Sequence, residues 1–268
     1  MAADSDFGFR LEEFDGLPAY LIHSWTRQLR LVHAILTRDG GVSRPPYATL
    51  NLGQAVGDDR AAVEANHARV YRALGIDRAQ VVKCHLVHGN AVHLVTARDG
   101  GQWLGKADGM ITGQPGIFLS MRFADCTPIL LNDSRRRAVG VVHAGWRGTL
   151  QNVAGVVVRA MIEALGCRAG DITAIIGPSV GPCCYQVGSD VIAAVEATLV
   201  GGETLLLRRN DGRVHFDLWQ ANQRQLLAAG VGQVLNMELC TVCHTHQFFS
   251  HRGEGGRTGR FGVVIGYR

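Results

Sequence analysis

Short apolar runs of strand length recur along the chain. Near the N-terminus they are AYLIHSW and LRLVHAILTR, and QVVKCHLVHGNAVHLVT predicts two strands around a turn at Gly89 and Asn90. Further on, GIFLSMRFADCTPILLND predicts two strands interrupted by residues 124–126. AVGVVHA, DITAII and the terminal FGVVIGYR predict three more. Continuous apolar runs of this length are typical of buried strands.

Four further segments have the spacing of amphipathic helices. Residues 57–75 place Val63, Val70 and Leu74 on one face, and Asp58 or Asp59 can cap the N-terminus. Helices and strands are mixed without strict alternation, which favours an α+β fold over a doubly wound sheet. The other three helices are expected at residues 149–166, starting at Thr149, at 187–199, with Ser189 as N-cap, and at 216–231, with Asp217 as N-cap.

Composition is that of a globular protein. Hydrophobic residues make up 47% of the 268 positions and charged residues 19%, which allows a large core and argues against disorder. No repeat, low-complexity segment or Pro/Ser-rich linker divides the chain. We therefore predict one catalytic domain, residues 1–268.

The charge is +4 and spread along the sequence, with one dense run at Arg135–Arg137. That run follows Asp133 and Ser134 and predicts an exposed turn. Because no aromatic or basic repeat accompanies it, we expect no nucleic-acid partner.

Location is predicted from the apolar runs and the N-terminus. No run reaches the ~18 residues that a membrane span needs. MAADSDFGFR is acidic and has no apolar core, so we expect no signal peptide, no membrane partner and a cytoplasmic protein. The seven cysteines are then expected to be reduced, and their odd number is a further argument against a disulfide framework.

Three polar residues lie where an apolar run stops and small residues begin. His88 is in the turn of LVHGNAV, Cys126 interrupts RFADCTPILL, and His143 ends the run in VGVVHAGWRG. Catalytic and ligand-binding groups usually lie at strand ends or on loops, and the glycines beside both histidines allow a ligand to approach the backbone closely. We therefore select these three as candidate site residues.

Two hypotheses for these residues stay open, besides ordinary structural roles. Two imidazoles and a thiolate form a good zinc set, and three protein ligands leave a fourth position for water or substrate. Without a metal, Cys126 could act as a nucleophile and His143 as its base. Spacing alone does not bring His88 to Cys126, and a cysteine in an apolar run is usually a core residue.

The most conspicuous short motif is CTVCHTH near the C-terminus. Cys240-x-x-Cys243-His244 is the spacing of a haem attachment site, but haem attachment needs export, for which no signal is found. A structural zinc bound by Cys240, Cys243 and His244 or His246 is a second hypothesis, although no second ligand pair lies at a typical finger spacing. We expect the motif to be local variation outside the active site.

Longer motifs connect the three candidate residues with one known family. ADC…P, HAGWRG and IGP…GPCCY, together with LTRDGGVSRPPYATLNLGQAVGDD and FFSHRGEGGRTGR, resemble the YfiH family, also called the laccase-domain or polyphenol-oxidase-like family. The similarity covers nearly the whole chain from about Thr37. It implies that the metal ligands are His88, Cys126 and His143, with zinc as the metal and copper as an alternative.

The resemblance also implies a fold and an activity. The fold is a single-domain α/β/β/α layered sandwich with mixed sheets, similar to the catalytic domain of cytotoxic necrotizing factor, which uses a Cys–His pair. The implied reactions are phosphorolysis of adenosine, inosine or methylthioadenosine to base and (methylthio)ribose 1-phosphate, and deamination of adenosine to inosine. The expected partners are purine nucleosides and phosphate, and the expected assembly is a monomer or homodimer.

Other residues are candidates because of this chemistry. A guanidinium matches phosphate oxygens, and Arg147 in HAGWRG is the first candidate, with Arg252 and Arg260 behind it. Asp125 is expected to orient a ligand, transfer a proton or make a structural hydrogen bond. Asn51 in TLNLG resembles a family residue near the site.

Some positions depart from the family pattern or have no assigned role. Leu86 stands where the family usually has Gln, so a hydrogen bond or substrate contact is expected to be missing. His251 and Gly253 replace a tyrosine and an arginine that are common in the last motif. Cys183 and Cys184 of GPCCY have no predicted chemistry, and we interpret them as small thiols buried in a loop.

Three other classes of function stay open. A copper-dependent, laccase-like polyphenol oxidase needs many histidines and several His-x-His pairs, and this chain has 11 histidines and one such pair, so we rank it low. Copper would nevertheless bind a His/Cys/His site more tightly than zinc. A Cys–His amidohydrolase that edits peptidoglycan precursors would use Cys126 as nucleophile and His143 as base. The third class is a non-catalytic interaction protein.

Overall fold

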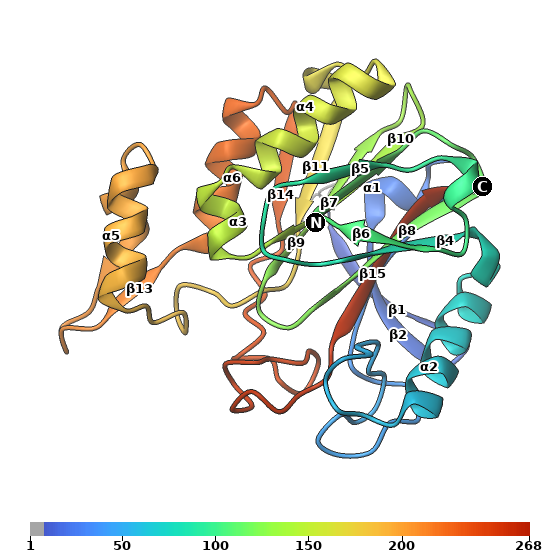
Figure 1. Ribbon diagram of the computed structural model, residues 1–268, viewed down its shortest axis with the longest axis horizontal. Helices are drawn as coiled ribbons and strands as arrows, with labels where there is room; N and C mark the ends of the chain where they lie inside the picture. The colour runs from blue at the N-terminus through green and yellow to red at the C-terminus, as the bar shows by residue number, and fades with distance from the viewer. Residues whose placement is uncertain (1–7) are drawn as a thin grey trace, which may run out of the picture.

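The computed structural model describes residues 8–268, in which two mixed β-sheets stack face to face (Figure 1). The larger sheet has the strand order β1-β2-β3-β15-β8-β4-β6 and the smaller one β14-β11-β9-β10-β7-β5. The strands of the larger sheet are β1 (Phe9–Phe14), β2 (Leu17–Ile22), β3 (Leu31–Leu36), β4 (Val81–His85), β6 (Trp103–Lys106), β8 (Ile117–Phe123) and β15 (Phe261–Tyr267). Those of the smaller sheet are β5 (Val92–Leu94), β7 (Gly109–Thr112), β9 (Thr127–Asp133), β10 (Ala138–Ala144), β11 (Ile172–Ile176) and β14 (Gln233–Asn236).

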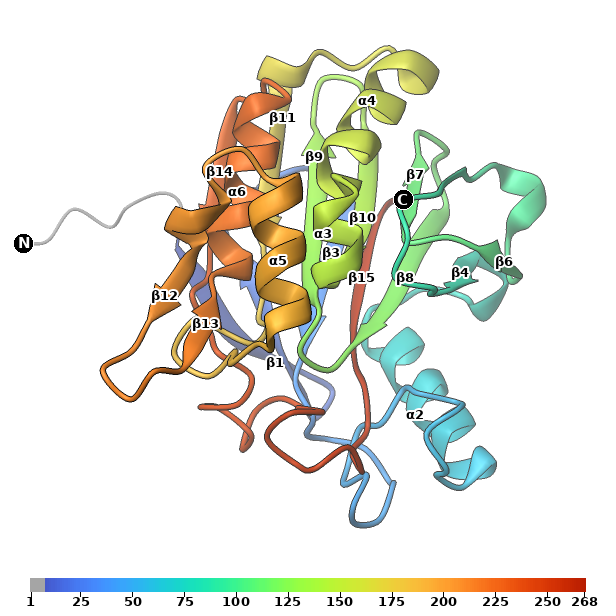
Figure 2. The ribbon, with the colours of Figure 1, turned by 60° about the vertical axis from the view of Figure 1, so that its left-hand side comes forward.

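Helices cover the outer faces of this stack. α4 (Val153–Leu165) and α6 (Leu218–Ala228) lie on the smaller sheet, whereas α2 (Arg60–Ala73) lies on the other side of the molecule, against the larger sheet (Figures 1 and 2). The remaining elements are α1 (His23–Thr26), α3 (Trp146–Leu150), α5 (Ser189–Thr198) and the hairpin of β12 (Leu206–Arg208) and β13 (Val214–Phe216).

The core is divided into layers by the sheets. Between the two sheets, Leu119 and Val263 of the larger sheet belong to the same buried cluster as Leu130 and Val141 of the smaller one. Separate apolar clusters fill the spaces under α4 and α6 and under α2. Strands β9, β10 and β15 are therefore buried along their whole length, which explains their continuous apolar sequences.

The predicted α+β class and the layered sandwich are confirmed, but the turn expected at Gly89 and Asn90 does not join two paired strands. β4 and β5, expected to flank a simple turn, lie in different sheets, each paired in parallel with other strands. The sequence between them carries His88, in the left-handed region at φ 60°, and crosses from one sheet to the other. A crossing of this kind also separates β8 from β9, and both crossings lie at the candidate site.

Helix ends follow the predicted caps in part. Asp59 accepts a hydrogen bond from the backbone N–H of Ala61, and Asp217 accepts one from Gln220, so these two caps are confirmed. Thr149 is not a start: α3 contains it, and Asn152, at φ 56°, caps α4 by accepting the Gly155 N–H. Ser189 begins α5 as its first residue but makes no capping hydrogen bond.

The arginine-rich turn lies at the surface, and none of the described helices is a candidate membrane span. Residues 134–137 are exposed in the turn between β9 and β10, as their arginines predicted. Among residues 8–268, no helix has both the length and the apolar character needed to cross a bilayer.

Candidate active site and metal centre

The three candidate residues converge at one end of the sheet stack. His88 follows β4, Cys126 lies in the crossing between β8 and β9, and His143 is near the end of β10. One ligand atom of each lies within 4.8 Å of the others, and the two imidazole rings meet edge to face at 5.0 Å. Gly145 completes the close fit, because a Cβ there would lie 2.9 Å from His88 Cδ2 and 3.0 Å from Cys126 Sγ.

Asp108, a residue that sequence analysis missed, holds two residues of this cluster in place through hydrogen bonds. Its fully buried carboxylate lies 2.8 Å from Nδ1 of His143 and accepts the backbone N–H groups of Val87, His88 and Gly89 at 3.2, 2.9 and 2.7 Å. Burial alone would raise the pKa of Asp108, but the hydrogen bonds from His143 and the backbone lower it. A single carboxylate thus fixes both histidines of the site.

The bond to Asp108 also determines which nitrogen of His143 is available. Because Nδ1 faces the carboxylate, Nε2 is left for the cluster. Carboxylate–histidine pairs of this kind orient metal-binding imidazoles and raise their basicity. Together with the thiolate and the exposed ring of His88, the donor set fits a zinc-type ion with three protein ligands.

The metal-free chain holds Cys126 and His143 as a charged pair. Burial raises the pKa of the Cys126 thiol, but the charge of His143 and hydrogen bonds from both histidines outweigh it and lower the pKa to about 6. Burial lowers the pKa of His143, but Cys126 and Asp108 raise it to about 9. A thiolate next to an imidazolium is suited both to metal binding and to nucleophilic chemistry.

The three cluster residues line a cavity of about 440 Å³. A volume of this size is typical of small-molecule sites. Besides the three cluster residues, its lining includes Leu86, Arg122, Asp125, Tyr185, His251, Arg252 and Arg260. The departure at Leu86 therefore lies in the cavity wall and puts an apolar side chain where the family usually has an amide.

Asp125 is placed at the cavity but is occupied by hydrogen bonds. Its carboxylate accepts the hydroxyls of Thr241 and Ser250 and the backbone N–H of Arg252, each at 2.6 Å. Its backbone adopts φ 86°, in the left-handed region. These contacts favour the structural alternative, in which Asp125 ties the segment between β14 and β15 to the site.

The predicted arginines are distributed unequally. Arg252 and Arg260 line the cavity, whereas Arg147 is exposed, lies 4.1 Å from the Trp146 ring and does not line it. Asn51 is fully buried, and its side-chain oxygen accepts the backbone N–H of Arg260 at 2.8 Å. Asn51 therefore supports the loop of Arg260 and does not face the cavity.

Arg122, which sequence analysis missed, is a further cationic residue of the cavity. Its Nη2 donates to the carbonyl of Cys84 at 3.1 Å, and its buried Nη1 has no hydrogen-bond partner in the described part of the chain. Burial, together with the charge of Arg260, lowers its pKa to about 10. The only sequence signal was a charged residue inside the largely apolar run of β8.

Comparison with known proteins identifies the family. Residues 32–268 match the family model described as multi-copper polyphenol oxidoreductase laccase. The chain belongs to this family. It is 39% identical over 247 residues to purine nucleoside phosphorylase YlmD of Geobacillus stearothermophilus, covering 88% of this chain and 90% of that protein. It is also 40% identical over 238 residues to a purine nucleoside phosphorylase of Deinococcus radiodurans, covering 89% and 90%.

Solved structures of this laccase-like family agree with the fold. The Bacillus licheniformis hypothetical protein YfiH matches with a TM-score of 0.90 at 34% identity, over 97% of this chain and 99% of that one. YlmD from Geobacillus stearothermophilus matches with a TM-score of 0.89 at 36% identity, over 98% and 99%. The predicted resemblance to the YfiH family is confirmed.

Proposed function

We propose that this chain is a zinc-dependent purine nucleoside phosphorylase. The observation that carries the proposal is one cavity that combines a His/Cys/His cluster with three arginines. Within residues 8–268, no carboxylate forms an ion pair with Arg122, Arg252 or Arg260. Cations that face a cavity without a carboxylate partner favour an anionic ligand, and relatives named purine nucleoside phosphorylase make phosphate the first choice.

Phosphate is assigned to the arginine side of the cavity. Arg122 lines this side with a largely buried guanidinium held by the carbonyl of Cys84, and Arg260 adds a second guanidinium whose Nη1 is tied to the carbonyls of Thr258 and Gly259. Arg252 is held by the carbonyl of Gln186 at 2.8 Å. Because other bonds already fix these side chains, little conformational entropy is lost when the phosphate binds.

The nucleoside is assigned to the space between this arginine side and the His/Cys/His cluster. Tyr185 and Leu86 provide the apolar surface that a purine ring needs. In phosphorolysis a phosphate oxygen forms a bond to C1′ of the ribose, the bond from C1′ to the base nitrogen breaks, and the base leaves with a proton. When zinc is bound by His88, Cys126 and His143, it supplies a Lewis acid next to the substrate.

We extend the proposal to adenosine, inosine and methylthioadenosine as substrates and to deamination of adenosine. Deamination replaces the amino group of the purine with an oxygen from water and needs no phosphate. Phosphorolysis and deamination therefore make different demands on the arginine side of the cavity. A cytoplasmic location and a monomeric or homodimeric assembly stay predictions.

The test is product analysis with adenosine and inosine, each with and without phosphate. Phosphate-dependent release of adenine or hypoxanthine with ribose 1-phosphate supports phosphorolysis, and phosphate-independent inosine from adenosine supports deamination. The absence of all these products from zinc-loaded protein would overturn the proposal. A Cys126→Ser variant serves as the control, since it removes one donor from the cluster.

A Cys–His amidohydrolase is a second candidate because Cys126, His143 and Asp108 form a linked series of nucleophile, base and orienting acid. This candidate predicts activity on an aminoacylated muramyl nucleotide that survives chelation but is lost in Cys126→Ser. Loss of that activity on chelation would count against it.

A copper polyphenol oxidase is the candidate favoured by the description of the family model. Within residues 8–268, however, two groups could hold a metal, and only one of them contains histidine. Stoichiometric copper with strong phenol oxidation in protein from zinc-replete cells would support this candidate and displace the phosphorylase.

A further inference from the structure

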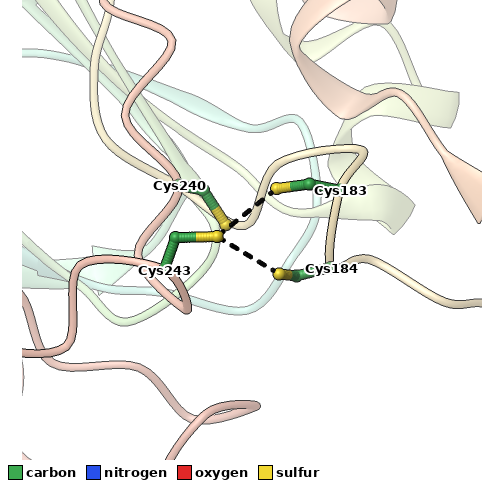
Figure 3. Close-up of side chains that lie close together, drawn as sticks. All are labelled: Cys183, Cys184, Cys240 and Cys243. Atoms are coloured by element: carbon green, nitrogen blue, oxygen red, sulfur yellow. Dashed lines mark hydrogen bonds between the residues drawn. The ribbon is translucent and has the colours of Figure 1, made fainter.

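Four cysteines meet at a second location, outside the His88–Cys126–His143 cluster. Cys183 and Cys184 come from the loop after β11, and Cys240 and Cys243 come from the loop after β14 (Figure 3). β11 and β14 are parallel neighbours, so the loops that follow them begin at the same end of the smaller sheet. The interpretation of Cys183 and Cys184 as buried thiols is wrong, since Cys183 is exposed and Cys184 half-buried.

The sulfur positions match a tetrahedral metal site. All four Sγ atoms lie within 4.8 Å of one another, and Cys243 Sγ lies 3.7 Å from that of Cys183 and 3.5 Å from that of Cys184. A tetrahedron with zinc–sulfur bonds of about 2.3 Å has sulfur–sulfur edges of about 3.8 Å. An iron–sulfur cluster, which places several iron ions between its four thiolates, needs wider separations.

The backbone around the sulfurs holds this arrangement. The N–H groups of Cys184 and Tyr185 both donate to the carbonyl of Gly181 at 2.9 Å, which makes a tight turn and turns both adjacent cysteines to the cluster. The N–H of Gly181 donates to Cys240 Sγ at 3.3 Å. A Cβ at Gly181 would lie 2.5 Å from the Trp219 ring of α6 and 3.2 Å from Cys240 Cβ in the other loop, so glycine is needed for this close approach.

We propose that Cys183, Cys184, Cys240 and Cys243 bind one zinc ion as four thiolates. Each thiol gives up its proton when the ion binds, so binding strengthens as pH rises. Four protein ligands leave no open position, and the site is therefore structural. His244 is not a ligand, because it does not belong to the group of donor atoms that lie within 4.8 Å of one another; its Nδ1 lies 2.9 Å from the Cys240 carbonyl.

The proposed ion would fix one wall of the cavity. Tyr185, which lines the cavity, directly follows Cys184. Thr241, between the two C-terminal ligands, donates to Asp125, which in turn accepts the N–H of Arg252. The proposal depends on none of the reactions considered above, and metal content tests it without an activity assay.

Zinc content per chain is the first measurement, made on reduced protein after zinc loading and desalting. The Cys183→Ser/Cys184→Ser variant is expected to lose one equivalent relative to wild type, and the control Cys167→Ala, which removes a buried thiol elsewhere, is expected to lose none. Equal zinc in wild type and the double variant would overturn the proposal, as would iron in place of zinc.

Alkylation of the wild-type protein covers the case in which the double variant does not fold. Cys183 and Cys243 are exposed, so iodoacetamide should reach them after chelation and label them at least tenfold faster than once zinc is restored. Labelling at the same rate in both states overturns the proposal. A disulfide among the four cysteines that persists in reduced, zinc-loaded protein would also overturn the proposal.

Discussion

Asp108 and His143 form a buried pair in which the carboxylate lies 2.8 Å from Nδ1 of the imidazole. The same carboxylate accepts the backbone N–H of His88, so it orients two of the three proposed metal ligands. An Asn at position 108 keeps the volume but removes the charge and offers an N–H where three backbone donors need an acceptor. We expect Asp108→Asn to weaken zinc binding roughly 10–100-fold, measured by competition with a chromogenic chelator.

Asp133→Asn is the matched control for that substitution. Asp133 is also fully buried and accepts two backbone N–H groups, those of Arg135 and Arg136, but it lies at the far end of β9. We expect Asp133→Asn to cost stability without changing zinc affinity. Equal losses of affinity in the two variants would show that the effect comes from the fold and not from the orientation of His143.

Arg122 provides a test of the phosphate assignment. Arg122→Met keeps an unbranched apolar stem but removes the positive charge from the cavity lining, together with the guanidinium carbon that lies 4.2 Å from the centre of the Trp103 ring. Since a hydrogen bond to a charged group contributes about 1.5–3 kcal/mol, we expect KM for phosphate to rise roughly 10–100-fold. Initial rates at varied phosphate and saturating inosine measure it.

Arg147→Met is the control for this experiment. Arg147 is exposed and outside the cavity lining, so its replacement is expected to leave KM for phosphate unchanged. A large increase of KM for phosphate in Arg147→Met and none in Arg122→Met would show that phosphate binds at the HAGWRG motif instead. Deamination of adenosine needs no phosphate and should be insensitive to both variants.

Cys126 is expected to become a reactive thiolate when the metal is removed. Its pKa of about 6 keeps it ionised at about pH 7, whereas burial raises the pKa of Cys84 to about 12. Chelated protein should therefore be alkylated by iodoacetamide at Cys126, as located by peptide mass spectrometry, with a rate that falls below about pH 6. Labelling of Cys126 no faster than of Cys84 would contradict the charged pair with His143.

The sequence predicted the fold class and three cluster residues, but not their supports. Buried strands can be predicted from continuous apolar runs. Ionisable groups interrupt or end such runs at His88, Cys126 and His143. Asp108 gives no comparable signal, because its importance comes from hydrogen bonds to His143 and to a backbone segment about twenty positions away. Contacts of that kind depend on how the two sheets stack.

The cysteine cluster shows the same limit at longer range. The C-x-x-C spacing of Cys240 and Cys243 is visible in the sequence, but their neighbours Cys183 and Cys184 lie 60 and 59 positions from Cys243. The parallel pairing of β11 with β14 brings the two pairs together. Spacing rules for metal sites describe one local segment, so they pointed to His244 and His246 as the missing ligands.

Acid pH is expected to destabilise the protein through buried histidines, of which His33 offers the clearest test. Burial lowers its pKa to about 4, and its Nε2 accepts the backbone N–H of Ile22 at 2.9 Å. The unfolded chain takes up a proton at this residue from about pH 6.5 downward, whereas the folded chain does so only near pH 4. Stability is therefore lost as pH falls through this window, by roughly 3 kcal/mol for this residue.

His33→Gln retains an acceptor for Ile22 but cannot titrate, so its free energy of unfolding should fall less than that of wild type between pH 6.5 and about 4. Urea unfolding at several pH values across the window measures the difference. His246→Gln, at an exposed histidine, is the control and should follow the wild-type curve. Loss of metal in acid affects all three proteins alike, so parallel curves for wild type and His33→Gln would mean that His33 does not contribute.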